Sequence, residues 1–427
     1  MTTALLTDRY EFTMLDAARK AGIADRPTVF EVFARSLPAG RRYGVVAGLG
    51  RLLDQLAEFR FEDDTLAALD DDGIVGPATL DWLSTYRFQG DLHAYPEGEL
   101  YVADSPVLSV SATFGEAVLL ETLVLSVLNH DSAIASAAAR IVGAAAGRGL
   151  LEFGGRRTHE EAAVAAARAA FIAGFDGTSN LEAGARHGIP TLGTTAHAFV
   201  LLHDDETTAF QAQVDAAGPG TTILVDTYDT ARGIARALEV AGSELGGIRI
   251  DSGDLATAAR DARAQLDAAG ATRARIVTSG DLDEYRIAEL TDAPIDAFGV
   301  GTKLVMGSGA PTAGFVYKLV ARAEGPDAPL APVAKAGGDK ATVGGRKAAF
   351  RRRVDGIAVA EPVRPWGSSA ADNERPLQVP VLIDGERVHD PTLAEIREHH
   401  RTAMSELAGP ARSLEPGEPA WSIEEEL

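Results

Sequence analysis

Seven clusters of polar and glycine residues recur through the middle of this sequence, and each lies at the end of a short apolar run typical of a β-strand. The clusters are Gly154–Arg157, Asp176–Asn180, Gly193–His197, Asp226–Asp229, Arg249–Asp254, Ser279–Asp281 and Gly299–Lys303. The carboxyl ends of parallel strands lie on one face of their sheet, where catalytic loops sit. We therefore expect the clusters to converge on one site.

Two of the clusters indicate a phosphate ligand. "TSGD" (278–281) and "GVGT" (299–302) each run from a strand into a glycine-containing turn ahead of a predicted helix. Backbone N–H groups in such turns can hold a phosphate, with help from the helix dipole. Either turn alone would more often be structural, whereas two on neighbouring strands favour a phosphosugar.

The cluster "RIDSGD" adds a cation and a carboxylate. Arg249 can bind a planar anion through two parallel hydrogen bonds. Asp251 can meet a ribose hydroxyl or a magnesium ion. The alternative is that Arg249 forms an ion pair with Asp251 or Asp254.

His197, in "GTTAHAFV", is a candidate nucleophile. A histidine beside apolar residues is more often a core residue, but this one stands just beyond a strand end, four residues after Gly193. Asp226 ends the next strand and is predicted to accept a hydrogen bond from one ring nitrogen of His197. That contact would fix the tautomer and leave the other nitrogen free to attack.

The elements that position these residues form one repeating pattern from Leu151 onward. Apolar runs alternate with helical stretches, which predicts parallel strands joined by helical crossovers. Seven such units would almost close an α/β barrel, and an open doubly wound sheet is the alternative. Thr158 and Glu161 form a capping-box pattern before the first helix. We expect the barrel at 126–327, an N-terminal α/β domain at 1–125, and a segment at 328–427 that packs on the N-terminal domain.

Composition excludes several classes of protein. The chain has 427 residues, a net charge of −22 and no cysteine. A negative surface does not attract nucleic acid, and without cysteine there are no disulfides, zinc–thiolate sites or thiol nucleophiles. We find no signal-peptide pattern at the N-terminus and no apolar run near the roughly 20 residues that span a bilayer. We therefore expect a cytoplasmic enzyme that binds neither nucleic acid nor membrane.

The motifs also occur in a family order. "LLTDRYEFTM" near the N-terminus is followed by "EFGGRR", "GFDGTSNLEAG", "GTTAHAFV", "LVDTYDT", "IRIDSGDL", "IVTSGDLDE", "FGVGTKL" and "FVYKLV". This ordered set covers about Leu5 to Val320 and resembles nicotinate phosphoribosyltransferase, a type II phosphoribosyltransferase. The resemblance implies an irregular parallel α/β barrel and a smaller α/β domain built from the N-terminal region and the C-terminal tail. It also implies a homodimer with active sites at the subunit interface.

The reaction implied by the resemblance joins nicotinate to phosphoribosyl pyrophosphate, with ATP as co-substrate and Mg²⁺ as cofactor, held mainly by substrate phosphates. His197 matches the histidine that ATP phosphorylates, and Asp226 matches its orienting carboxylate. Tyr10 would reach one face of the pyridine ring from the neighbouring subunit, opposite Phe153. The other nicotinate contacts fall on Arg156, Ser179, Thr194 and Arg249. The phosphoribosyl and phosphate contacts fall on Asp251, Ser279, Gly280, Gly301 and Thr302.

Two motifs depart from the family pattern. The tail pattern Lys-x-Thr-x-Pro-Gly-x-Lys is matched at Lys340, Thr342, Gly345 and Lys347. Gly344 replaces its proline, which leaves the backbone of that loop less restrained. Gly155 replaces the leucine of "EFGLRR" and removes a side chain near Arg156.

Three other functions stay open. A nicotinamide phosphoribosyltransferase shares the fold and most motifs. A phosphosugar lyase or isomerase needs a Schiff-base lysine or a carboxylate base at a strand end, whereas Lys303 follows its turn. A catalytically inactive relative is disfavoured because the residues predicted to carry the chemistry are all present.

Overall fold

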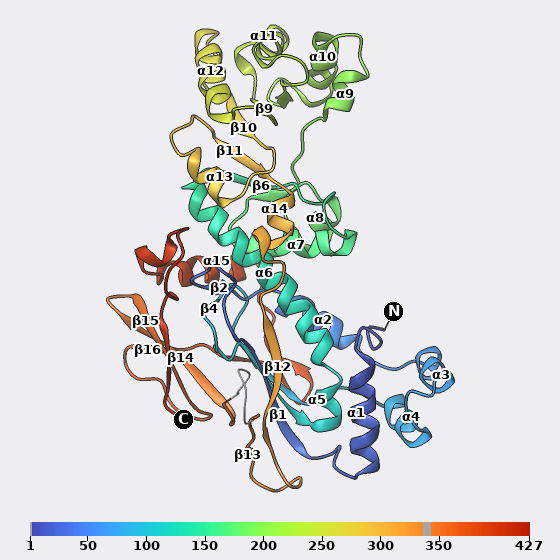
Figure 1. Ribbon diagram of the computed structural model, residues 1–427. Coiled ribbons are helices and arrows are strands. Elements are labelled where there is room, and N and C mark those ends of the chain that lie inside the picture. Colours follow the sequence, from blue (N-terminus) through green and yellow to red (C-terminus); the bar gives the residue numbers. More distant parts are fainter. Residues whose placement is uncertain (1, 336–342) are drawn as a thin grey trace. The chain divides into compact units, whose positions relative to one another are not determined.

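The computed structural model describes residues 2–335 and 343–427, so Lys340 and Thr342 lie outside the described residues. The chain forms two compact units, residues 1–136 with 312–427, and residues 137–311 (Figure 1). Residues 312–327, predicted to belong to the barrel, lie in the first unit because β12 (Phe315–Arg322) pairs with β1 (Pro27–Ala34). Residues 126–136 also belong to the first unit, within helix α6 (Glu121–Ala145), where Val127 and Leu128 join its core.

The second unit is built on a parallel sheet of six short strands. Their order is β7 (Gly177–Thr178), β6 (Gly149–Glu152), β11 (Ala297–Val300), β10 (Arg275–Thr278), β9 (Gly247–Ile250) and β8 (Thr222–Leu224). The last strand along the chain, β11, thus pairs with the first, β6. The predicted strand at 191–193 forms only a parallel bridge from Thr191 to Thr178, and no pairing among the described residues joins it to β8. The sheet is a curled parallel half-barrel.

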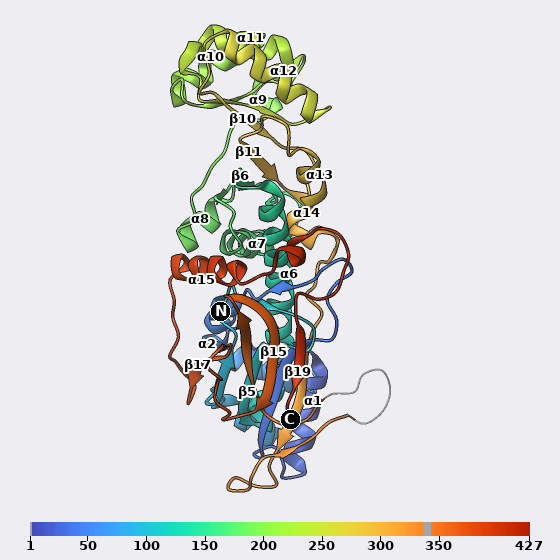
Figure 2. The ribbon, with the colours of Figure 1, turned by 90° about the vertical axis from the view of Figure 1, so that its left-hand side faces the viewer.

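Helices follow the strands of the second unit. They are α7 (Glu160–Ile172), α8 (Leu181–His187), α9 (His197–Leu201), α10 (Glu206–Ala217), α11 (Thr230–Ala241), α12 (Leu255–Ala268), α13 (Glu284–Glu289) and α14 (Thr302–Val305). Helices α10, α11 and α12 pack side by side (Figures 1 and 2). Strand residues such as Ile223, Ile248 and Ile276 are fully buried, as in parallel strands that are covered on both faces.

Side-chain caps set where several of these helices begin. The caps are Asn180 of α8, Asp205 of α10, Asp229 of α11 and Asp254 of α12. Each accepts a hydrogen bond from a backbone N–H in the first turn, as these residue types commonly do. The capping box predicted at Thr158 is wrong, because α7 begins at Glu160. His159 is therefore the N-cap, and its ring accepts from the backbone N–H of Glu161.

The first unit contains a seven-stranded sheet that combines both ends of the chain. Its order is β13 (Ala331–Pro332), β12, β1, β5 (Leu108–Thr113), β3 (Asp91–Ala94), β17 (Val379–Ile383) and β18 (Glu386–Arg387), and neighbours are antiparallel. The remaining N-terminal elements are α1 (Arg9–Lys20), β2 (Gly44–Val45), α2 (Leu49–Ala57), α3 (Asp63–Asp71), α4 (Pro77–Ser84), β4 (Leu100–Tyr101) and α5 (Phe114–Val118). Because β17 pairs with β3, the tail completes the N-terminal sheet.

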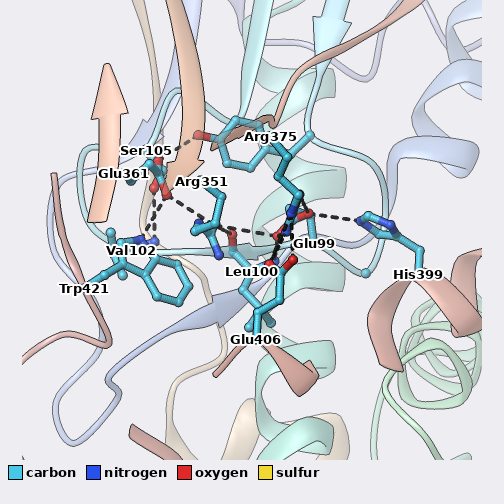
Figure 3. A network of polar contacts seen from close by, with 12 residues as sticks. Glu99, Leu100, Val102, Ser105, Arg351, Glu361, Arg375, His399, Glu406 and Trp421 are labelled. Atoms are coloured by element: carbon cyan, nitrogen blue, oxygen red, sulfur yellow. Dashed lines mark hydrogen bonds and ion pairs between the residues drawn. The ribbon is translucent and has the colours of Figure 1, made fainter. Parts of the chain in front are cut away.

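The tail adds a second sheet and a helix, held by a buried ionic network (Figure 3). The sheet order is β16 (Glu374–Pro376), β14 (Lys347–Val354), β15 (Ile357–Pro365) and β19 (Ser422–Glu425), and the helix is α15 (Leu393–Ser405). Arg351 is fully buried, 3.6 Å from Glu99 and 3.3 Å from Glu361. The indole N–H of Trp421 donates to Glu361 at 3.0 Å. Glu99 comes from the N-terminal region, so these paired charges connect the tail to it. Removing one partner of such a buried pair would leave an uncompensated charge.

Candidate active site

Five of the seven polar clusters lie at the carboxyl ends of strands in the second unit, the cluster 193–197 follows the single bridge at Thr191, and the cluster 176–180 is the exception. Asp176 precedes β7, and its carboxylate accepts a hydrogen bond from the backbone N–H of Leu150 in β6 at 2.9 Å. It therefore lies toward the amino end of the sheet. Only Ser179 and Asn180 of that cluster follow the strand, and Asn180 is a helix cap.

The guanidinium of Arg249 lies beside a second side chain that was predicted to contact nicotinate. Its Nη1 donates to Thr194 Oγ1 at 2.6 Å, which brings together two of the predicted nicotinate contacts. Its Nη2 lies 3.8 Å from Asp251 Oδ1, a loose form of the predicted alternative ion pair. Nε of Arg249 is buried and has no partner among the described residues. Burial lowers the pKa of Arg249, and the positive charge of Arg156 lowers it further. The carboxylates of Asp251 and Asp226 oppose this shift. The guanidinium is thus half-buried, and its Nε–H donates to no atom of the described residues.

His197, the first residue of α9, lies beside the loop that carries Asp226, but the two side chains have different partners. His197 Nδ1 lies 3.1 Å from Thr227 Oγ1. The hydrogen bond predicted from His197 to Asp226 is not formed between the described residues. Asp226 Oδ2 instead accepts from the backbone N–H of Asp251 at 2.8 Å and from the Ser252 hydroxyl at 2.9 Å, because the pairing of β8 with β9 fixes those donors beside it. Asp226 Oδ1 is buried without a partner in the described chain.

The turn after β10 is held against the loop after β9. The Ser279 hydroxyl donates to Asp251 Oδ1. Gly280 has a φ of +112°, and a Cβ there would lie 2.3 Å from the carbonyl oxygen of Asp251. Two predicted phosphate-binding residues and Asp251 therefore form one packed group, in which position 280 requires glycine.

The turn after β11 lies against Phe153. A Cβ on Gly299 would lie 2.5 Å from the Phe153 ring, so glycine leaves room for the predicted pyridine-stacking side chain. Gly301 is the N-cap of α14 and Thr302 its first residue. Helix α14 has four residues and α13 has six, both shorter than two turns. Phosphate binding here would depend on individual backbone N–H groups. Helices this short add little of the dipole contribution predicted from the sequence.

Two predicted nicotinate contacts, Arg156 and Ser179, are exposed side chains on the turns after β6 and β7. Sequence reasoning missed two residues that hold this region. Thr227 bonds the His197 ring, and the buried carboxylate of Glu152 accepts from Gly154 N and Thr178 Oγ1. A charged residue at the end of an apolar strand was the available signal for Glu152.

Tyr10 belongs to the first unit, in the first turn of α1, and 44% of its surface is exposed. Burial of the hydroxyl end raises the pKa of Tyr10, and the carboxylates of Glu121 and Glu11 raise it further. Glu11 itself is fully buried and accepts from the backbone N–H of Thr122 at 3.0 Å. The side chain of Tyr10 thus stands at the surface on a firmly anchored helix.

The described residues contain neither a metal-binding cluster nor a helix that could span a membrane. No group of three or more histidine, aspartate or glutamate side chains is placed to hold a metal ion there. None of the helices among the described residues combines the length and the apolar character needed to cross a membrane.

Two family models match most of this chain. Residues 5–129 match the family model of the nicotinate phosphoribosyltransferase (NAPRTase) N-terminal domain, and residues 149–325 match that of the NAPRTase family. Nicotinate phosphoribosyltransferase pncB1 of Mycobacterium tuberculosis is 56% identical over 97% of this chain and 94% of its own length.

Two solved structures are similar over nearly the whole chain. Human nicotinic acid phosphoribosyltransferase has a TM-score of 0.84 at 26% identity, over 98% of this chain and 97% of the other. Nicotinate-nucleotide pyrophosphorylase from Pyrococcus furiosus has a TM-score of 0.79 at 26% identity, over 94% and 95%. On the two family models and the 56% identity, the chain belongs to the nicotinate phosphoribosyltransferase family.

Proposed function

We propose that this protein is a nicotinate phosphoribosyltransferase that forms nicotinate mononucleotide and pyrophosphate from nicotinate and phosphoribosyl pyrophosphate, a step of NAD biosynthesis. The observation that carries the proposal is the half-buried guanidinium of Arg249, bonded to Thr194 and left with a buried, unpartnered N–H among the described residues. A planar carboxylate such as that of nicotinate matches those donors in charge and geometry.

The proposed reaction is a displacement at the anomeric carbon. The pyridine nitrogen forms a bond to that carbon while the bond to the pyrophosphate oxygen breaks, and the electron pair leaves with pyrophosphate. Arg249 and Thr194 would hold the carboxylate, with Arg156 and Ser179 beside it, so that the ring nitrogen faces the ribose. Phe153 would cover one face of the ring, and Tyr10 of the partner subunit the other.

The phosphoribosyl group would occupy the turns after β9, β10 and β11. Its contacts would be Asp251, Ser279, Gly280, Gly301 and Thr302. Backbone N–H groups there would stabilise charge as it develops on the leaving pyrophosphate. Mg²⁺ bound mainly by substrate phosphates would add to that stabilisation; the unpartnered oxygen of Asp226 and the carboxylate of Asp251 are the protein oxygens suited to contact it.

His197 would couple ATP hydrolysis to this reaction. If Nδ1 donates to Thr227, Nε2 carries the lone pair and can attack the terminal phosphorus of ATP, while the bond to the bridging oxygen breaks and ADP leaves. Water would later cleave the phosphohistidine and release phosphate. Asp226 would act beside the phosphohistidine through its free oxygen. The added negative charge near the substrate phosphates would favour release of pyrophosphate.

The family membership supports three further proposals. The enzyme would be a homodimer with shared active sites, because Tyr10 belongs to a family active-site motif yet comes from the N-terminal region. The half-barrel would form part of an irregular α/β barrel, with the N-terminal region and the tail as a smaller α/β domain. We place the enzyme in the cytoplasm, since its phosphorylated substrates do not cross a bilayer unaided.

The test is an assay of purified protein with phosphoribosyl pyrophosphate, with and without ATP, using nicotinate or nicotinamide in turn. Formation of nicotinate mononucleotide and nicotinate-stimulated release of ADP are expected. Higher kcat/KM with nicotinamide would reassign the substrate, and failure to consume either pyridine would refute the function. An equal yield without ATP would leave the transferase in place and remove the proposed coupling.

A further inference from the structure

Glu152 is a buried carboxylate at the end of β6 that the proposed chemistry does not use. Only 1% of its surface is exposed. Its Oε1 accepts a hydrogen bond from the backbone N–H of Gly154, and its Oε2 accepts one from the hydroxyl of Thr178. Its backbone oxygen accepts from the N–H of Ser179 at 2.9 Å. One residue thus contacts two separate turns, those after β6 and β7.

These two turns carry three of the six proposed nicotinate contacts. The turn after β6 holds Phe153 and Arg156, and the turn after β7 holds Ser179. Thr178 extends the connection, because its hydroxyl oxygen also accepts from the backbone N–H of Asn180 at 3.0 Å. The contacts of Glu152 therefore set the spacing between the turn after β6 and the turn after β7.

The charge of Glu152 has no cationic partner among the described residues, although burial makes such a charge costly. Burial raises the pKa of Glu152, and the two hydrogen bonds to its carboxylate oppose that shift. A neutral amide of the same shape would be cheaper to bury, but it would offer one acceptor and one donor. Both partners of Glu152 donate, so only a carboxylate accepts from both.

We infer that Glu152 is a positioning residue for nicotinate, which acts by joining the turns that carry Phe153, Arg156 and Ser179. The inference rests on the proposed function. Glycine at position 154 belongs to the same arrangement, because a Cβ there would lie 2.8 Å from Glu152 Oε1. The phosphoribosyl contacts after β9 and β10 have other partners, so the effect of Glu152 should be selective for the pyridine.

The experiment compares the kinetics of three variants with the parent enzyme. Glu152→Gln keeps the shape and removes one acceptor, and it should raise KM for nicotinate by roughly tenfold. KM for phosphoribosyl pyrophosphate and kcat should stay within about twofold of the parental values. A general loss of structure would change these two constants together with the KM for nicotinate. Thr178→Val should reproduce the effect, and Thr178→Ser, which keeps the hydroxyl, should restore the parental KM.

Glu206→Gln is the matched control. Glu206 is also buried in the second unit, but it is paired with Arg236 at 3.6 Å and contacts neither turn. Its substitution should leave KM for nicotinate unchanged. If Glu152→Gln fails to fold, Thr178→Val tests the same contact. If the parent is active and the Glu152 and Thr178 variants have the parental KM for nicotinate, the inference about Glu152 is overturned and the proposed function stands. If the parent makes no nicotinate mononucleotide, the proposed function is overturned as well.

Discussion

Gly280 occupies a backbone position that other residues do not adopt without strain. Its φ is +112°, and a Cβ there would lie 2.3 Å from the carbonyl oxygen of Asp251. Relieving the contact requires a separation of at least 3.0 Å, which moves the turn after β10 away from the loop after β9. The backbone conformation costs alanine about 1–3 kcal/mol, and overpacking adds about 1–3 kcal/mol. We expect Gly280→Ala to lower the free energy of unfolding by about 2–6 kcal/mol.

Gly270→Ala is the matched control for this substitution. Gly270 follows the end of α12 with a φ of +79°, but an added Cβ would meet no atom within 4 Å. Only the cost of the left-handed backbone conformation applies at position 270, so Gly270→Ala should lower the free energy of unfolding by about 1–2 kcal/mol. Urea unfolding followed by circular dichroism measures both variants against the parent.

The two variants should also differ in activity. The displaced turn carries Ser279, which bonds Asp251, so Gly280→Ala should raise KM for phosphoribosyl pyrophosphate under conditions where the protein is folded. Gly270→Ala should leave that constant unchanged. Equal losses of stability in the two variants would refute the argument from close approach, because backbone strain alone would then account for both.

The other predictions concern the proposed chemistry directly. His197→Ala should abolish acid-labile labelling by ATP but keep part of the transferase activity; undiminished label would remove the assignment. Mixing inactive Tyr10→Ala and Arg249→Ala proteins should restore activity through hybrid dimers, and no recovery despite demonstrated subunit exchange would count against a shared site. Ser179→Asp should lower kcat/KM for nicotinate by about a hundredfold through like-charge repulsion and shift preference toward nicotinamide. An unchanged ratio of the two kcat/KM values would show that Ser179 does not select the substrate.

The positions of most polar clusters relative to the strands were predictable from sequence because they depend on a local pattern. Five of the seven apolar runs became strands, whereas Phe175 precedes β7 and the run at Thr191 makes only a bridge. Asp176 was misassigned because the strand was predicted to end at Phe175, whereas β7 is Gly177–Thr178. Asp176 therefore precedes the strand and lies toward the other end of the sheet. Strand boundaries are the least certain part of such predictions.

The partner of each site residue was not predictable in the same way. A hydrogen bond between loops depends on the register of the strands that carry them, and one residue of displacement exchanges its partners. His197 meets Thr227 where Asp226 was expected, one position away along the chain. The end of the second unit differs from the predicted end of the barrel for a related reason. No local pattern in 312–327 indicates that β12 pairs with a strand near the N-terminus.

The contacts that hold the candidate site run between loops more than within them. Thr194 accepts a hydrogen bond from Arg249 in β9. Asp226 and Ser279 bond Asp251 from the strands on either side of β9. Such bonds form because β8, β9 and β10 are neighbours in the sheet, so that loops distant in sequence meet. A side chain that is held by the next loop is in position before substrate binds, and less binding energy is then spent on ordering it. Because Asp226 accepts from the backbone N–H of Asp251 and Ser279 donates to the Asp251 carboxylate, disturbing either neighbouring loop should displace the same residue.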